Sequence, residues 1–261
     1  MIESSSWFWP AFMMIIGLVM GSAVTALSYR IPRSLSWIQG RSACPSCHAP
    51  LQVLDLIPVL SFAISRGRCR HCGARIAWRY PLTELMCGAW TLLLYRQVGL
   101  TPALPLLALW GYILVALLWI DLDFQLLPDV LTLPGTLLGV AAALTVPGGA
   151  HQALLGIVVG SGALWLIGWL YEKLRKTEGM GFGDVKLAAM FGAVLGWELT
   201  VLTLFVASLL GSLWGGWLIF RRTGHSQTAL PFGTLLAPAA MVTFLWGENW
   251  IRGYVGLFVG R

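Results

Sequence analysis

The chain has 261 residues, of which 57% are hydrophobic and 11% charged, and its formal net charge is +6. This composition is too apolar for an ordinary soluble domain and indicates a polytopic membrane protein. The positive charge does not imply nucleic acid, because the basic residues gather between the apolar segments.

The apolar segments predict about eight membrane-crossing helices. A crossing helix requires roughly twenty residues, and the candidates are residues 7–28, 82–98, 104–121, 129–147, 152–171, 184–196, 199–220 and 232–257. The stretch from 184 to 220 is too long for one crossing, so we expect it to turn at Gly196-Trp197-Glu198. Gly247-Glu248-Asn249 interrupts the last segment, where we expect the helix to break or end. Glu3 precedes the first segment, and no basic region leads into it. We therefore expect a retained helix rather than a signal peptide.

Basic residues cluster in three of the connecting segments. Of the 17 Lys and Arg residues, eight lie in residues 30–79, four in residues 173–186 and two at positions 221 and 222. With eight alternating crossings these segments share one side of the membrane, which the positive-inside rule makes the cytoplasm. Both termini would then face outward. Anionic lipid headgroups are the expected partners of the basic loops.

Two C-x-x-C pairs lie in the loop after the first apolar segment. Their cysteines are Cys44, Cys47, Cys69 and Cys72. Two such pairs 21 residues apart have the spacing of a structural zinc ribbon, in which four thiolates complete a tetrahedral shell. Two disulfides are the competing interpretation, but a cytoplasmic loop is kept reduced, which favours Zn2+. There are two further alternatives. One C-x-x-C pair could be redox-active, or His48 or His71 could replace one thiolate as a ligand.

The remaining cysteine, Cys87, stands alone in an apolar segment, where a small packing role is expected. The predicted fold class is an all-α polytopic membrane protein with a small zinc-ribbon-like cytoplasmic loop domain. We divide the chain into a first transmembrane helix (1–28), a four-cysteine loop domain (29–80) and a transmembrane domain (81–261).

Carboxylates stand where a membrane makes them costly, which points to protons, ions or peptide-bond chemistry. The first acidic motif contains Asp121 and Asp123 and runs on to Leu127-Pro128-Asp129. Asp121 follows a long apolar run, and Asp123 lies about 200° further round a helix, so only one of the two is expected to face inward. Asp129 follows a proline at a predicted helix start, where capping is the simpler interpretation.

The second acidic motif is Gly181-Phe182-Gly183-Asp184-Val185-Lys186. Asp184 would serve as a helix N-cap, but capping does not require glycines at 179, 181 and 183, which indicate a close approach of the backbone to a neighbour. Lys186 either stabilises a nearby charged carboxylate or marks the inner edge of the membrane. We keep both alternatives for Lys186.

These motifs resemble those of the bacterial type IV prepilin peptidases. That family carries an Asp-x-x-x-x-x-Leu-Pro-Asp pattern and a Gly-x-Gly-Asp-x-Lys pattern, and the segments 121–129 and 181–186 match both. The cysteine pairs, the Arg79-to-Leu85 run, the basic loops and the eight-helix layout are also similar. The first helix departs from the family's Gly-Ser-Phe-Leu-Asn, because this chain reads Gly21-Ser22-Ala23-Val24-Thr25.

The resemblance implies a membrane aspartic endopeptidase that cuts the basic leader of type IV prepilins or pseudopilins after a glycine, as in type IV pilus and type II secretion systems. It implies Asp121 and Asp184 as the catalytic pair, which would share a proton and activate water. It also implies methylation of the new amino terminus with S-adenosylmethionine, and a place in the bacterial inner membrane with the zinc loop and active site facing the cytoplasm. Glu84, Glu172 and Glu178 are weaker candidates for contact with the basic leader.

Two other functional classes compete with a peptidase. A proton-coupled membrane transporter also uses intramembrane aspartates, but it predicts inverted repeats, and neither acidic motif has a second copy. A non-catalytic assembly factor that docks through the zinc loop would tolerate loss of either aspartate.

Overall fold

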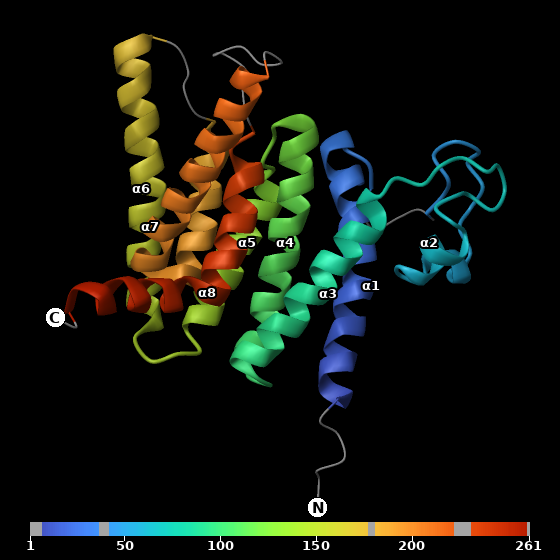
Figure 1. Ribbon diagram of the computed structural model, residues 1–261, viewed down its shortest axis with the longest axis horizontal. Coiled ribbons are helices and arrows are strands. Elements are labelled where there is room, and N and C mark those ends of the chain that lie inside the picture. Colours follow the sequence, from blue (N-terminus) through green and yellow to red (C-terminus); the bar gives the residue numbers. More distant parts are fainter. Residues whose placement is uncertain (1–6, 37–41, 177–180, 222–230, 260–261) are drawn as a thin grey trace, which may run out of the picture. The chain divides into compact units, whose positions relative to one another are not determined.

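The computed structural model describes residues 7–36, 42–176, 181–221 and 231–259 (Figure 1). Within these ranges the regular structure is helical, and the extended pairing consists of isolated bridges. The helices are α1 (Phe8–Arg30), α2 (Leu60–Ile64), α3 (Arg79–Val98), α4 (Ala103–Phe124), α5 (Asp129–Ala143), α6 (Gly149–Arg175), α7 (Phe182–Phe220) and α8 (Gly233–Val259). The chain forms two compact units, Met1–Leu104 and Pro105–Arg261.

The predicted fold class, an all-α polytopic membrane protein with a small cysteine loop, is confirmed. Each predicted apolar segment corresponds to a helix or to one half of α7, although α5 ends at Ala143, four residues before the predicted end at 147. In the described part of the chain, four helical stretches are long and apolar enough to cross a membrane, namely Phe8–Arg33, Ala103–Phe124, Gly149–Arg175 and Phe182–Leu218. Helix α5 is apolar but shorter, and α3 is less apolar because it carries Arg79, Glu84 and Arg96.

In the first unit, α1 and α3 pack together through small residues. A Cβ atom on Gly17 would lie 2.5 Å from the carbonyl oxygen of Cys87, and one on Gly21 would lie 2.5 Å from Cα of Glu84. Only glycine allows the two backbones to come this close, as at many helix contacts in membranes. Cys87 is fully buried in this contact, as expected for a packing residue.

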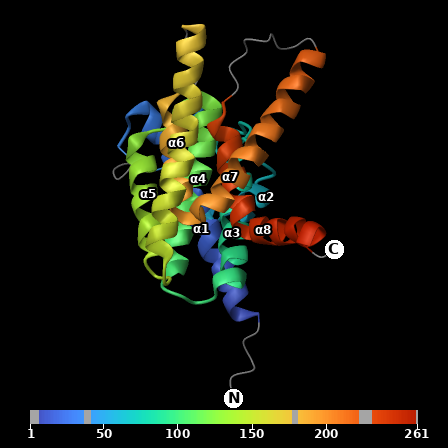
Figure 2. The same cartoon turned by 90° about the vertical axis from the view of Figure 1, so that its left-hand side faces the viewer.

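In the second unit, the chain reverses at Gly196 within α7. Gly196 has φ 69° and ψ −179°, a conformation that L-residues rarely adopt. Both halves of α7 then run beside α6, since a Cβ atom on Gly160 would approach the carbonyl oxygen of Ala188 at 2.8 Å and Cγ2 of Thr200 at 2.9 Å. The predicted turn at Gly196 is therefore confirmed. Figure 2 shows α6 and α7 from the side.

The last helix, α8, does not end at Gly247-Glu248-Asn249 but continues to Val259. Figure 1 shows that it bends sharply before its final turns. The expectation that this helix would end is therefore wrong, whereas a change of direction is present. The three-part division at residues 28 and 80 stays a prediction, and by packing α3 belongs with α1 in the first unit.

Candidate active site and metal centre

Asp121 lies at the end of α4 with only 4% of its surface exposed. Its Oδ2 accepts two hydrogen bonds from Thr234 at the start of α8, one from the backbone N–H at 2.6 Å and one from the hydroxyl at 2.9 Å. Both donors stabilise negative charge on this oxygen, and the helix N-terminus adds its positive dipole end. Asp121 is thus a buried carboxylate with one oxygen held in place.

Asp184 lies in the first turn of α7. The helix begins two residues earlier, at Phe182, so the alternative that Asp184 is its N-cap is wrong. Its Oδ1 atom is buried and has no hydrogen-bond partner within the described part of the chain. Asp121 is near enough to interact electrostatically with Asp184. The structure therefore brings together the two aspartates that the sequence singled out.

Leu127 contacts the starts of α7 and α8, next to the two aspartates. A Cβ atom on Gly183 would lie 3.0 Å from Cβ of Leu127, and one on Gly233 would lie 3.1 Å from Cδ1 of the same leucine and 3.0 Å from Oδ2 of Asp121. These contacts give a reason for the glycines at 183 and 233, because any side chain there would press on the site. The glycine at 179 lies outside the described residues, as does Glu178.

A second contact joins α4 to the first half of α7. The indole N–H of Trp110, a fully buried side chain, donates to the carbonyl oxygen of Met190 at 3.3 Å. Trp110 and Asp121 lie on α4, and Met190 and Asp184 lie on α7. The helices that carry the aspartates are therefore fixed to each other in the core of the second unit.

The other acidic candidates lie apart from this pair. Asp123 is exposed whereas Asp121 is buried, as their spacing on one helix requires. Asp129 is in the first turn of α5, where its charge complements the helix dipole, and its Oδ1 lies 2.6 Å from Nζ of Lys186. The partner of Lys186 is therefore Asp129, and the pair ties the start of α5 to the start of α7.

Sequence reasoning missed Thr234 and Gly233. The only local signal is Pro231-Phe232-Gly233-Thr234 at the start of the last apolar segment, a pattern of proline, glycine and hydroxyl typical of a helix N-terminus. Nothing in that pattern indicates a carboxylate partner 113 residues away. The contact becomes visible only in the folded unit.

The two C-x-x-C pairs fold into knuckles with the same hydrogen bonds. In the first knuckle, the N–H of His48 donates to the carbonyl oxygen of Cys44 at 2.9 Å. In the second, the N–H of Gly73 donates to the carbonyl oxygen of Cys69, also at 2.9 Å. Both donor residues have positive φ, 56° and 71°. Isolated antiparallel bridges flank the knuckles, Ala43 with Pro50 and Arg68 with Arg75.

The knuckles bring four thiols together. The Sγ atoms of Cys44, Cys47, Cys69 and Cys72 all lie within 4.8 Å of one another, and those of Cys44 and Cys72 are 3.9 Å apart. A tetrahedral site with Zn–S distances of 2.3 Å places its sulfurs ~3.8 Å apart. Backbone N–H groups of Cys47 and Ser46 lower the pKa of Cys44 to about 6, whereas, despite a backbone hydrogen bond from Ala74, burial and the neighbouring thiols raise the pKa of Cys72 to about 11. Cys44 is therefore the thiol that ionises most readily for a metal. The four cysteines are free and form a cluster that could bind a metal, whereas His48 and His71 are not part of it.

A small cavity of about 150 Å³ lies between the cysteine loop and the first two long helices of the same unit. Ser22 of α1 and Glu84 of α3 line it, together with Cys44 and Tyr80. The Ser22 hydroxyl donates to Glu84, and Oε2 of Glu84 also accepts the backbone N–H of Val59 at 2.7 Å. Glu84 thus connects the membrane helices of this unit to its loop.

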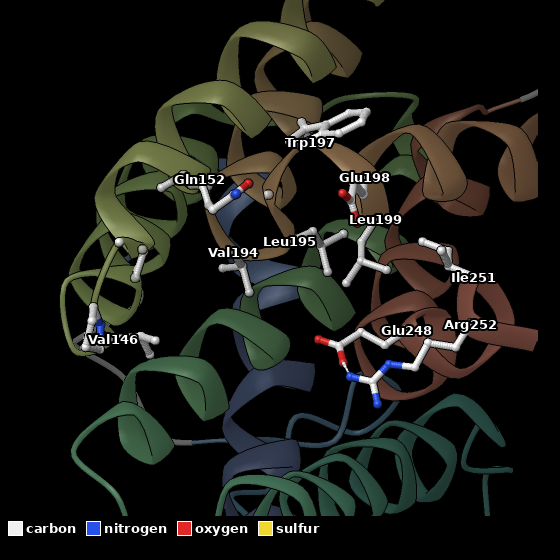
Figure 3. Close-up of a pocket in the computed structure, with 17 residues that line it drawn as sticks. Val146, Gln152, Val194, Leu195, Trp197, Glu198, Leu199, Glu248, Ile251 and Arg252 are labelled. Carbon is white, nitrogen blue, oxygen red and sulfur yellow. Dashed lines mark hydrogen bonds and ion pairs between the residues drawn. The ribbon is translucent and has the colours of Figure 1, made fainter. Parts of the chain in front are cut away.

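A larger cavity of about 650 Å³ lies in the second unit, at the Gly196 reversal (Figure 3). Gln152, Glu198 and the ion pair between Glu248 and Arg252, at 2.9 Å, line it. Its floor is ~18 Å from Asp184, judged from the helical rise between residues 184 and 196. This cavity is therefore separate from the paired aspartates.

Comparison with known proteins gives two matches that together span most of the chain. Residues 15–98 match the Bacterial Peptidase A24 N-terminal domain, and residues 108–216 match the Type IV leader peptidase family. The boundary between the matches coincides with the division between the two compact units.

Several similar proteins carry the name prepilin leader peptidase/N-methyltransferase. The one from Aeromonas salmonicida (strain A449) is 42% identical over 220 residues, which are 82% of this chain and 74% of that protein. The one from Aeromonas hydrophila is 36% identical over 97% of this chain and 96% of that protein. The one from Pseudomonas putida is 37% identical over 90% of this chain and 90% of that protein. No solved structure matches the chain. On these matches, the chain belongs to the type IV leader peptidase family.

Proposed function

We propose that this membrane protein is an aspartic endopeptidase that removes the leader of type IV prepilins or pseudopilins after a glycine, and that it also methylates the new amino terminus. The single observation that carries the peptidase assignment is the convergence of Asp121 and Asp184, from segments 63 positions apart, in a chain of this family. A proton-coupled transporter finds no support, since the relatives are named as peptidases.

The proposed reaction uses the difference between the two carboxyl groups. Asp121, held by two donors from Thr234, carries the negative charge and takes a proton from the attacking water. Asp184, whose Oδ1 has no donor in the described chain, carries the shared proton and gives it to the scissile carbonyl oxygen. The oxygen of water bonds to the carbonyl carbon, giving a tetrahedral diol. Its collapse breaks the C–N bond as the amine takes a proton from Asp121 and one hydroxyl of the diol returns its proton to Asp184, which leaves a carboxylic acid and restores the starting protonation of the pair.

The substrate's position follows from the charge of the loops. The basic segments around residues 30–79, 173–186 and 221–222 support a position for the end of α4 and the start of α7 at the cytoplasmic face of a bacterial inner membrane. A substrate with a polar leader and an apolar helix would present its junction at that depth. Membrane lipids surround the helices, and no nucleic acid is involved.

The methyltransferase activity is assigned to the first unit. S-adenosylmethionine supplies the methyl group when it is bound. The cavity at Ser22 and Glu84 has a carboxylate that can hold and orient the incoming amine, and its wall is shared with the cysteine loop. We assign Zn2+ to the four cysteines as a structural ion, because four thiolates leave no open coordination position.

The test incubates the purified full chain with a prepilin-like substrate and sequences the amino terminus of the product. Wild-type protein should release a product that begins after the glycine, while Asp121→Asn and Asp184→Asn should release none. Asp123→Asn is the matched control, because that residue is exposed on the same helix and should leave cleavage within a few-fold. Cleavage by either dyad variant at a rate near that of wild type would overturn the assignment. The assembly-factor alternative predicts instead that the wild-type protein itself releases no product.

A further inference from the structure

Two arginines face each other across the second cysteine knuckle. Arg68 and Arg75 form an antiparallel bridge, flanked by hydrogen bonds from the N–H of Ile76 to Gly67 at 2.7 Å and from the N–H of Cys69 to Ala74 at 2.8 Å. This pattern makes them a non-hydrogen-bonded pair, the type whose side chains lie closest together. Like charges directly opposite on a sheet are destabilising. An anion bound between the two guanidinium groups would offset this repulsion.

No carboxylate within the described residues forms an ion pair with either arginine. Asp55 is engaged by Arg70 at 3.1 Å, and Glu84 by the N–H of Val59. In the equivalent bridge of the first knuckle the residues are Ala43 and Pro50, which carry no charge. The knuckle fold itself thus has no need of two arginines at these positions.

The arginines line a cavity that also contains a third basic side chain. The cavity has a volume of about 650 Å³, and Arg66, Arg68 and Arg75 all contribute to its wall. All three side chains are exposed, so their charges are available to a ligand from outside. Guanidinium groups bind phosphate through paired N–H donors, which makes phosphate the anion that fits best.

The other wall of the cavity is apolar and leads onto a membrane helix. Phe62 and Trp78 pack with ring centroids 4.9 Å apart, and Trp78 is 77% exposed. Pro81 and Leu85 of α3 complete the wall, and α3 packs along the membrane-crossing α1. Trp at this place is typical of the boundary between headgroups and acyl chains.

We propose that this cavity binds the phosphate of an anionic phospholipid headgroup, with its acyl chains along α3. A free phosphate would use the arginines but would leave the adjoining aromatic and aliphatic wall uncovered. The continuation of this wall onto α3, which packs along the membrane-crossing α1, favours a lipid over a nucleic acid. Basic pockets beside membrane helices take anionic lipids in this way. The site lies outside the paired aspartates and outside the four cysteines, and its assignment does not depend on the peptidase reaction.

The experiment measures lipid binding to the full chain in detergent by native mass spectrometry, with phosphatidylglycerol and phosphatidylcholine as probes. Wild-type protein should bind phosphatidylglycerol about thirtyfold more tightly than phosphatidylcholine, if each of two arginines contributes as a basic residue near a membrane surface does. The double variant Arg68→Gln with Arg75→Gln should lose this preference. The double variant Arg68→Lys with Arg75→Lys should retain part of it.

A charge-matched control is the double variant Arg96→Gln with Arg221→Gln, which removes two exposed arginines elsewhere. It should keep the preference, and an equal loss would overturn the proposal by showing a non-specific charge effect. Glycerol 3-phosphate, added at the same concentration as phosphatidylglycerol, should not displace the bound lipid. If it displaces the lipid as well as phosphatidylglycerol itself does, the proposal that the ligand is a lipid is overturned. Because Arg68 adjoins Cys69, metal content is measured in parallel. If the first variant loses metal, Arg66→Gln with Arg75→Gln decides the question, and an unchanged preference there overturns the site.

Discussion

The backbone N–H and the hydroxyl of Thr234 both donate to one oxygen of Asp121, Oδ2, at 2.6 and 2.9 Å. The two residues are 113 positions apart, and each is buried. Two donors on one oxygen restrict the rotation of this carboxylate, which interacts electrostatically with Asp184. Thr234 is therefore a positioning residue for the proposed dyad.

Replacing Thr234 by valine removes the hydroxyl donor and keeps the backbone donor. A hydrogen bond to a charged group contributes about 1.5–3 kcal/mol, so we expect kcat to fall by about ten- to hundredfold, with KM little changed. The measurement is the steady-state rate of leader cleavage across a range of pH. Thr234→Ser restores the hydroxyl and should recover most of the rate, whereas an equally slow serine variant would point to packing alone.

Adding a methyl group at Gly233 should disturb the site without unfolding the protein. Its Cβ atom would lie 3.0 Å from Oδ2 of Asp121 and 3.1 Å from Leu127, so the carboxylate has to move. We expect Gly233→Ala to reduce cleavage by at least tenfold while helicity by circular dichroism is unchanged. Gly216→Ala is the matched control, because nothing lies within 4 Å of a Cβ atom there. Equal activity of the two variants would show that the contact does not matter.

The ion pair between Lys186 and Asp129 should matter little for catalysis. The pair is partly exposed, with Asp129 55% accessible, and such pairs contribute about 0–1 kcal/mol. We expect Lys186→Met to keep cleavage within a few-fold and to lower the thermal midpoint only slightly. A loss of a hundredfold or more in kcat would mean that Lys186 acts on the catalytic aspartates instead.

Removing the metal should disorder the cysteine loop. The loop has few buried side chains, so an ion held by the four cysteines would be its main support. We expect about one zinc per chain by elemental analysis, and rapid trypsin cleavage near Arg66 to Arg75 after treatment with a chelator. Cys44→Ser should behave like the chelated protein, and Cys87→Ser, which changes a cysteine outside the cluster, should keep the metal. A metal-free wild-type loop that still resists trypsin would contradict a structural role.

The two proposed activities should separate at Glu84. Glu84→Gln removes the charge in the small cavity next to the cysteine loop and leaves Asp121 and Asp184 unchanged. We expect cleavage to continue and transfer of a labelled methyl group to the product to fall at least tenfold. Asp123→Asn, which changes an exposed carboxylate on α4, is the control for both readouts. If Glu84→Gln methylates normally, this cavity does not hold the amine.

Local patterns predicted those parts of the structure that local geometry controls. Gly196 interrupts an apolar run too long for one crossing, and a positive φ at that glycine reverses the chain. The spacing of Asp121 and Asp123 placed them on different sides of one helix. The two C-x-x-C pairs predicted a cluster of four thiols, because each pair is a short-range motif.

The contacts that sequence could not predict join distant segments. Thr234 has no local feature that indicates Asp121 as its partner. For Lys186 the sequence allowed either a role in stabilising a nearby carboxylate or a place at the inner edge of the membrane, and only the folded structure shows Asp129 beside it. Such contacts depend on how α4, α5, α7 and α8 pack, which involves the small residues of several helices at once.

The reversal at Gly196 has a consequence for the bilayer itself. From Phe182 to Leu195 the first half of α7 is ~21 Å long, and α5, with 15 residues, is ~22 Å long, while a hydrocarbon layer is about 30 Å thick. These two short helices pack together, since Gly135 and Gly139 of α5 contact Met190 and Ala193 of α7. Their far ends open into the cavity lined by Glu198 and Glu248. Lipid around them must thin or leave their ends wet. Either response brings the aqueous boundary closer to these two helices than a full hydrocarbon layer would.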